Sequence, residues 1–298
     1  MKMPTPAPAD DSSGKAEASA VSSPNPTISN AESKPDFVEL CLYADCPLCG
    51  SKAFVHYRTD DCSKHAMYKP TLSPKIQWML CKACAHIFRN GYYSDDACNI
   101  LFTDTLTVQV VGTEMEKHRQ ISAKMIEKVL PYRSSGAWLD VGFGNGSLLF
   151  TAKEYGFHPI GLDLRKSSVD AMIQLGVHAY CNDIQTIQID PKCSVISMAD
   201  VLEHMPFPRA GLQAAHALLE TDGVLFLSMP NCDSTLWQIM THQNMNPYWS
   251  EIEHCHNFGR QRLYALLTEV GFEPVRYGIS ERYRAGMEII ARKKPVPV

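Results

Sequence analysis

The sequence has no apolar run approaching the roughly 20 residues that cross a bilayer, no apolar signal segment at its start and no internal repeat. The first two absences predict a soluble chain with no membrane partner. A basic stripe is also missing, because 28 thinly spread Lys and Arg against 32 Asp and Glu leave a net charge of −4. Phosphate binding needs such a stripe, so a nucleic-acid partner is not expected.

Cysteine, by contrast, is plentiful. The count of eleven is odd, and without a signal segment a reducing cytoplasm explains these thiols better than a disulfide framework does. The 298 residues exceed the needs of one core. We expect a disordered tail rich in Pro, Ser and Ala at 1–36, a small metal module at 37–95 and a larger domain at 96–298. No particular oligomeric state is predicted.

Residues 138–163 have the order strand, glycine turn, helix and strand. Glycines follow the first strand at Gly142, Gly144 and Gly146, and the second strand ends at Asp163. At the carboxyl edge of a parallel sheet, glycines let the backbone approach a ligand, and the helix start offers unpaired N–H groups. Asp163 is placed to accept hydrogen bonds from ribose hydroxyls. The segment therefore predicts a nucleotide-cofactor pocket.

The glycine spacing distinguishes between cofactors. A dinucleotide fingerprint needs its third glycine at position 147, where this chain has Ser147. An acid two residues before the first glycine, Asp140, suits a cationic amino group better than a pyrophosphate. The segment resembles the first motif of class I S-adenosylmethionine-dependent methyltransferases, Asp/Glu-x-Gly-x-Gly-x-Gly. A dehydrogenase is the alternative.

The resemblance covers about 115–293 and implies further roles. It places Asp183, after the third strand, at the adenine amino group, and His204 of the Asp-Val-Leu-Glu-His segment near the reactive methyl. A surface role for Asp183 and a structural role for His204 are the alternatives. The implied S-adenosylmethionine site comprises Asp140, Gly142, Gly144, Gly146, Asp163, Leu164, Asp183, Ile184 and Ala199.

The remaining pattern fits one α/β fold. Apolar spacing predicts helices at 209–220 and 261–270, a buried strand at 223–230, and two final strands at about 272–279 and 284–292. Alternating strands and helices predict a mostly parallel sheet covered on both faces. The resemblance adds a Rossmann-like class I methyltransferase sheet with an antiparallel last strand.

Two Cys-x-x-Cys pairs precede this domain. The first pair is Cys46 and Cys49, the second is Cys81 and Cys84, and the 31 residues between the pairs make a four-thiolate zinc site plausible. The first pair has the Cys-Pro-x-Cys-Gly form of a zinc knuckle, whereas the second has Ala85 in place of glycine. The alternatives are free thiols, or a pair exchanged for Cys62 or His65. We expect a zinc ribbon with structural Zn²⁺.

Catalytic candidates lie after the fourth and fifth strands. Several small-molecule methyltransferases with a zinc ribbon, including sugar C-methyltransferases of antibiotic pathways, carry a Glu-His pair like Glu253-His254. The resemblance makes these residues an acid/base pair, with His204 and Tyr248 as possible helpers.

Other roles for this segment stay open. In one alternative the Glu-His pair only positions a lid, and in another Glu253, His254 and His256 bind a second metal. Aromatic and methionine side chains in the same insertion are lid packing or the lining of an apolar pocket: Trp237, Met240, Met245, Tyr248 and Trp249.

The sequence thus predicts a methyltransferase acting on a small molecule, such as a nucleotide-linked sugar or a specialised metabolite, with an O-, N- or C-acceptor. One alternative is a catalytically degenerate binding module that holds a partner through its ribbon. The other is an RNA methyltransferase, since ribbons read RNA in some enzymes that methylate ribosomal RNA.

Overall fold

The computed structural model describes residues 40–94, 97–98, 109–283 and 285–294. The tail predicted at 1–36 lies outside these residues, and so does the domain edge at 95 and 96. No helix within the described part of the chain is long and apolar enough to span a membrane.

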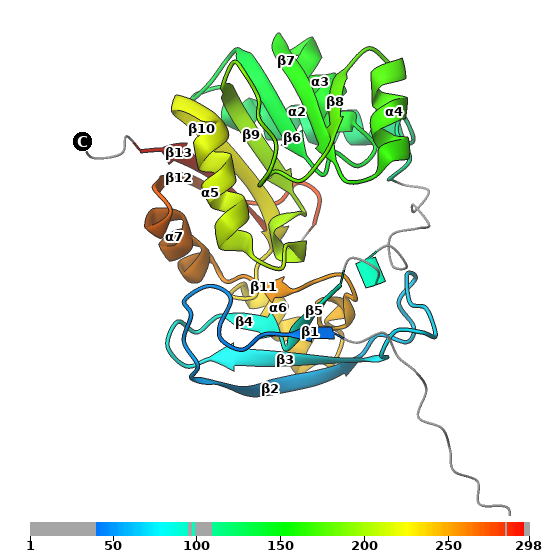
Figure 1. The fold of residues 1–298 in the computed structure, drawn as a ribbon, viewed down its shortest axis with the longest axis vertical. Coiled ribbons are helices and arrows are strands. Elements are labelled where there is room, and N and C mark those ends of the chain that lie inside the picture. The colour runs from blue at the N-terminus through cyan, green and yellow to red at the C-terminus, as the bar shows by residue number, and fades with distance from the viewer. Residues whose placement is uncertain (1–39, 95–96, 99–108, 284, 295–298) are drawn as a thin grey trace, which may run out of the picture. The chain divides into compact units, whose positions relative to one another are not determined.

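A seven-stranded sheet runs in the order β12-β13-β10-β9-β6-β7-β8 (Figure 1). Neighbouring strands from β10 to β8 are parallel, whereas β13 is antiparallel to both β10 and β12. The predicted, mostly parallel sheet with an antiparallel last strand is confirmed. The strands are β6 (Gly136–Val141), β7 (Phe157–Asp163), β8 (His178–Cys181), β9 (Cys193–Ala199), β10 (Leu219–Pro230), β12 (Phe272–Ile279) and β13 (Gly286–Lys293).

Helices cover both faces of this sheet because strand residues alternate in direction. Trp138 packs into a core cluster with Met125 and Leu148, from α2 and α3. Its neighbour Leu139 packs into another with Leu212 and Leu263, from α5 and α7. The helices are α2 (Met115–Val129), α3 (Ser147–Glu154), α4 (Lys166–Gln174), α5 (Pro208–Leu218) and α7 (Arg260–Glu269).

The N-terminal region forms a second sheet, which a later segment completes. Its four strands run in the order β11-β4-β3-β2, and β11 (His256–Asn257) comes from the insertion after β10. The other strands are β2 (Phe54–Asp61), β3 (Lys75–Cys81) and β4 (Ile87–Arg89); β1 (Leu40–Leu42) pairs separately with β5 (Gly91–Tyr93). The insertion also contains α6 (Thr235–His242) and the 3₁₀ turn η3 (Pro247–Ser250).

Shared packing joins the two sheets. Trp78 of β3 donates its indole N–H to the carbonyl of Trp249 at 2.9 Å, inside a core cluster that also contains Trp237. Arg209 of α5 donates two hydrogen bonds to the carbonyl oxygen of Leu48, in the first Cys-x-x-Cys loop. The cysteine-bearing region is therefore built into the larger fold.

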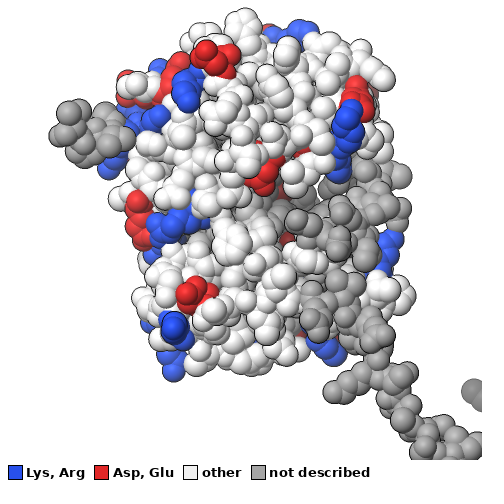
Figure 2. Space-filling model, viewed as in Figure 1, with Lys and Arg blue, Asp and Glu red and all other residues white. Residues whose placement is uncertain are grey.

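On the face shown in Figure 2, acidic and basic side chains are interspersed, and no basic stripe gathers on that face among the described residues.

Candidate active site

The glycine turn after β6 has room for a Cβ at only one of its three glycines. Gly142, Gly144 and Gly146 all have positive φ, of +65°, +55° and +80°. A Cβ at Gly142 would meet Val201 at 2.8 Å, and one at Gly146 would meet Met172 at 2.5 Å. A Cβ at Gly144 would have no atom within 4 Å. The loop is packed on both sides of Gly144 and open at Gly144 itself, as a backbone cradle for a ligand requires.

Ser147 stands where a dinucleotide fingerprint has glycine. It is buried at the start of α3, and its Oγ lies 2.9 Å from the Oγ of Ser122 on α2. The side chain thus fills the helix-packing position that glycine keeps free in dinucleotide-binding domains.

Asp140 is buried beneath the turn. Its Oδ1 accepts a hydrogen bond of 2.6 Å from Ser197 on β9. Burial raises the pKa of this carboxyl to about 6, and the positive charge of Arg282 opposes that shift. A buried carboxylate with one neutral donor favours a cation beside it, such as a ligand amino group.

Asp163, at the end of β7, is held by Arg165. Its Oδ1 accepts from the backbone N–H and the Nε of Arg165, both at 2.9 Å, and its Oδ2 accepts from Nη2 at 2.7 Å. Leu164, between them, is 72% exposed, so its side chain is free to cover a ligand. The sequence analysis did not single out Arg165, which orients the acid predicted to bind ribose.

The remaining predicted cofactor residues line the same sheet edge. Asp183 follows β8 and accepts a hydrogen bond from the backbone N–H of Gln185 at 2.7 Å. Ile184 and Ala199 are buried, the latter at the end of β9. Asp200 comes next, with φ +59° and an ion pair of 3.2 Å to Arg282.

Glu203, His204 and His254 form a buried cluster at the same edge, with one ligand atom from each lying within 4.8 Å of the others. Glu203 is 1% exposed, and neither of its carboxylate oxygens has a hydrogen-bond partner. The rings of His204 and His254 meet edge to face, with centroids 4.7 Å apart. Burial, followed by the neighbouring charge of Asp200, raises the pKa of Glu203 well above its usual value.

Glu253 lies in a different cluster from His254. Its carboxylate gathers with those of Glu251 and the ring of His65, and Glu251 Oε2 lies 2.9 Å from His65 Nε2. The Glu253 carboxylate thus groups with His65 and Glu251 and not with His254, because a turn at 252–253, in which the N–H of His254 donates to the carbonyl of Glu251 at 3.3 Å, lies between the two clusters. Glu203 takes the place beside His254. The sequence analysis missed Glu203, although it directly precedes His204.

The suggested second-metal set is also split. His256 Nδ1 lies 3.0 Å from Nε2 of His86, and its own Nε2 donates to the carbonyl of Met205 at 2.9 Å. It therefore sits in the joint between β4 and the loop after β9, apart from the cluster that contains His254.

The aromatic side chains of the insertion serve mainly as packing. Trp237 and Trp249 are 3% and 2% exposed, and the ring of Tyr248 stacks on Trp237 at 5.1 Å. Burial is the main cause of the raised pKa of Tyr248. Met240 is half-buried, whereas Met245 is 71% exposed.

The four predicted zinc ligands come together. Cys46 Sγ lies 3.7 Å from Cys84 Sγ, and Cys49 Sγ lies 3.6 Å from Cys81 Sγ. Four sulfurs at about 2.3 Å from one Zn²⁺ would be about 3.8 Å apart, so the spacing fits a tetrahedral ion and excludes disulfides.

Backbone donors support this thiolate set. N–H groups of Leu48 and Cys49 point at Cys46, where they oppose the rise in thiol pKa that burial causes. Cys62 lies elsewhere, with its Sγ against the carbonyls of Ser73 and Pro74, and His65 pairs with Glu251. The exchange of ligands considered from the sequence is therefore not the arrangement that the fold adopts.

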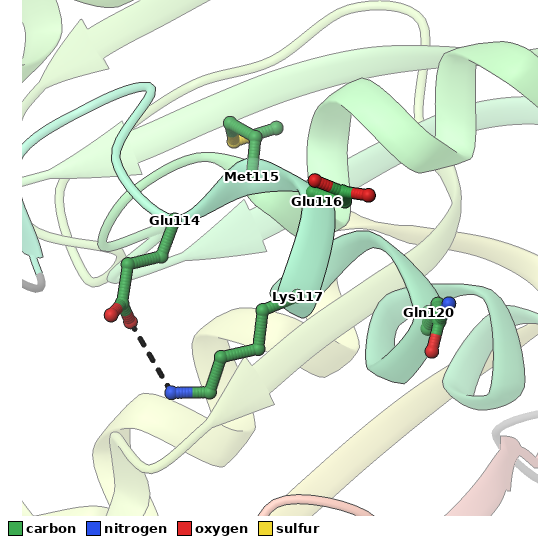
Figure 3. Close-up of a pocket in the computed structure, with 5 residues that line it drawn as sticks. All are labelled: Glu114, Met115, Glu116, Lys117 and Gln120. Atoms are coloured by element: carbon green, nitrogen blue, oxygen red, sulfur yellow. Dashed lines mark hydrogen bonds and ion pairs between the residues drawn. The ribbon is translucent and has the colours of Figure 1, made fainter.

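A surface hollow lies at the start of α2, lined by Glu114, Met115, Glu116, Lys117 and Gln120 (Figure 3). All of these residues come from one segment, and Lys117 pairs with Glu114 at 3.4 Å. Because no predicted site residue lines it, the hollow is not the candidate site.

The "Methyltransferase domain" family model matches residues 115–277, which are 163 of the 298 residues. The chain belongs to this methyltransferase family. The matched region contains the turn from Asp140 to Gly146 and most strands of the seven-stranded sheet. The family match and the strand order together confirm the predicted class I methyltransferase fold.

Two curated relatives and one solved structure show how far the likeness extends. A ubiquinone biosynthesis O-methyltransferase of Coxiella burnetii (strain Dugway 5J108-111) is 29% identical over 118 residues, covering 37% of this methyltransferase and 50% of the relative. The Haemophilus ducreyi enzyme of the same name is 30% identical over 105 residues, covering 31% and 44%. The chain thus spans about half the length of the curated relatives it matches.

The solved structure is a Burkholderia thailandensis 1,6-didemethyltoxoflavin-N1-methyltransferase with bound S-adenosylhomocysteine. It is 18% identical, covers 62% of this chain and 83% of its own, and has a TM-score of 0.48.

Proposed function

We propose that this protein transfers a methyl group from S-adenosylmethionine to a small-molecule acceptor. The observation that carries the proposal is the glycine turn, packed at Gly142 and Gly146 but open at Gly144, above the buried carboxyl of Asp140. This arrangement suits a ligand that brings a cationic amino group close to bare backbone.

Residues of this chain fit the rest of such a cofactor. Asp163, held in one orientation by three hydrogen bonds from Arg165, has one lone pair left, on Oδ2, to accept a hydrogen bond from a ribose hydroxyl. Asp183 would accept from the adenine amino group, between Leu164 and Ile184. The bound cofactor supplies a methyl group on a positively charged sulfur, which an aligned nucleophile can displace without further activation of the leaving group.

The acceptor is assigned to the cluster of Glu203, His204 and His254. Glu203 and His204 follow β9, and His254 lies in the insertion after β10. Burial, followed by the charge of His204, lowers the pKa of His254 well below its usual value, so its ring is neutral near pH 7 and offers a nitrogen lone pair to the acceptor site. Two further residues line this acceptor site. They are Glu253, whose backbone carbonyl accepts a hydrogen bond from the ring of His204, and Tyr248.

A small molecule is favoured over nucleic acid for three reasons. The net charge is −4, acidic and basic groups are interspersed on the face in Figure 2, and the curated relatives carry the name of a ubiquinone-pathway O-methyltransferase. The four-cysteine site would hold a structural Zn²⁺, because all four positions are filled by protein sulfur. Such reduced thiolates suit the cytoplasm.

Incubation with methyl-labelled S-adenosylmethionine and a cell extract tests the transfer. The label should enter the ultrafiltered small-molecule fraction with wild-type protein and not with Asp163→Asn. Label in RNA would assign the enzyme to the alternative substrate class. Cofactor binding without labelling of any fraction would favour a binding module that does not catalyse transfer.

A further inference from the structure

The carboxylate of Glu203 is buried without a compensating hydrogen bond from the protein. The side chain is 1% exposed, and both carboxylate oxygens are buried without a hydrogen-bond partner. Two neighbouring acids, Asp200 and Glu253, add negative charge that further disfavours the ionised carboxylate. The nearby Arg282 is engaged by Asp200 at 3.2 Å. Burying such a carboxylate costs several kcal/mol, on the order expected for an unpaired ion, unless a cation or a proton compensates it.

Two imidazoles face the same point. His204 donates its Nδ1–H to the carbonyl of Glu253 at 3.2 Å, a bond that leaves Nε2 with a lone pair. Metal-bound histidines are usually oriented by such a bond from the opposite nitrogen to a carbonyl. His254 is 6% exposed, and its Nδ1 is buried without a partner. The cluster thus places two imidazole rings beside a carboxylate that has no hydrogen-bond partner.

The geometry points to a divalent transition-metal site, and we propose that Glu203, His204 and His254 bind one such ion. Their ligand atoms lie within 4.8 Å of one another. Donors at about 2.1 Å from a tetrahedral ion would be about 3.4 Å apart. Side-chain rotations that move the ligand atoms by about an ångström would bring them to that separation. Two imidazoles and one carboxylate suit zinc, cobalt or iron better than magnesium or calcium.

This site is distinct from the four-cysteine cluster. It uses no sulfur, and its ligands come from the loop after β9 and from the insertion. Three protein ligands leave a position open, which is typical of catalytic ions, whereas the four cysteines fill a structural one.

The inferred ion also indicates which class of acceptor is methylated, and this second inference rests on the proposed function. A hydroxyl or enol oxygen of the acceptor would bind at the open position of the ion, which would lower the pKa of that oxygen so that its proton leaves to solvent. A lone pair of that oxygen then forms the bond to the methyl carbon, while the carbon–sulfur bond pair returns to sulfur and yields a neutral thioether. We therefore infer an oxygen acceptor. His204 and His254 would act by holding the ion.

Cobalt(II) titration of the full-length, zinc-loaded protein tests the site without cofactor or acceptor. One cobalt per chain should be retained beyond the zinc, with d–d absorption and without the intense thiolate-to-cobalt band that replacement of the four-cysteine zinc would produce. Glu203→Gln and His254→Gln should each weaken retention by at least about tenfold. Glu251→Gln, in the neighbouring cluster, is the matched control and should leave retention unchanged.

Three results would overturn the proposal: no cobalt retained beyond the zinc, retention only with the thiolate band, or retention that survives both ligand variants. Loss of cobalt in Glu251→Gln alone would also overturn it, because the ion would then belong to His65, Glu251 and Glu253. Calorimetry with S-adenosylmethionine on the same variants checks that they fold. Intact cobalt binding with no cofactor binding would contradict the proposed function and leave the metal site standing.

Discussion

At the scale of single residues, Gly144 makes the sharpest prediction. Its φ of +55° is a conformation that Asn tolerates better than other side chains, and a Cβ there meets no protein atom within 4 Å. Gly144→Asn should therefore fold, yet lose at least about tenfold in S-adenosylmethionine affinity, roughly 1.4 kcal/mol, because its side chain occupies the cradle. Calorimetry measures this loss.

Gly176 provides a matched control for that experiment. It also has positive φ, +74°, and open space around a Cβ, but it lies after α4 and outside the glycine turn. Gly176→Asn should bind like wild type. Equal affinities for Gly144→Asn and wild type would show that the cofactor does not approach this backbone.

Replacing Asp140 by Asn is expected to raise the stability of the fold and to weaken cofactor binding. Burial raises its pKa to about 6, above the unfolded value of about 3.9. The folded state therefore holds the extra proton between these values, and the free energy of unfolding falls as pH rises through that window, by about 3 kcal/mol from this group. Asp140→Asn should be more stable than wild type at about pH 7, with the advantage shrinking toward about pH 4.

Urea unfolding of both proteins across this pH window measures the difference. The same variant should bind S-adenosylmethionine more weakly, because the amide cannot pair with the cofactor's amino group. A stability difference that does not change with pH would refute the raised pKa of Asp140.

The sequence predicts cofactor residues where a motif fixes both spacing and position, as it does from Asp140 to Gly146, and that assignment stays a prediction. It did not identify Arg165, Arg282 or Glu203, whose roles depend on contacts that only the folded chain creates. Arg282, for instance, reaches Asp200 from the loop between β12 and β13. No sequence period links positions 82 residues apart.

At the scale of elements, the joint between β4 and β11 is the main addition to the prediction. Arg89 of β4 donates its backbone N–H to the carbonyl of Cys255 at 2.8 Å, and its side chain donates to Ile252, also at 2.8 Å. Cys255 also donates its own backbone N–H to the backbone carbonyl of Glu203 at 2.9 Å. A two-residue strand gives no sequence signal, so the link from the ribbon to the candidate acceptor site was not predictable.

The cysteine cluster makes a prediction at this scale. Cys49→Ser and Cys84→Ser should each lose zinc and expose the N-terminal sheet to protease, because metal binding and folding of such a site are linked. Cys41→Ser is the matched control, since Cys41 is exposed on β1 and outside the cluster. Metal analysis and limited proteolysis test all three. Full zinc content in both cluster variants would refute the four-cysteine assignment.

At the scale of the whole molecule, the central strands of the predicted α/β sheet were recoverable because they are apolar and buried, as in β10, where every residue from Gly223 to Pro230 is buried. The two regions, however, share one core. Leu48 and Phe88 of the cysteine-bearing N-terminal region lie in the same cluster as Leu139 of β6 and Leu263 of α7. Such sharing depends on tertiary packing, which a linear pattern does not encode.

This shared core predicts cooperative unfolding. Removal of zinc by a chelator should lower the melting temperature of one calorimetric transition that includes both sheets. Two separate transitions, with only the first sensitive to the chelator, would show that the ribbon unfolds independently.

The most direct test of the central claim is calorimetric titration of the purified protein with S-adenosylmethionine, with NAD as the comparison ligand. The glycine turn, Ser147 and Asp140 predict binding of S-adenosylmethionine with about micromolar affinity and no binding of NAD. Binding of NAD alone, or of neither ligand, would contradict the account of this pocket.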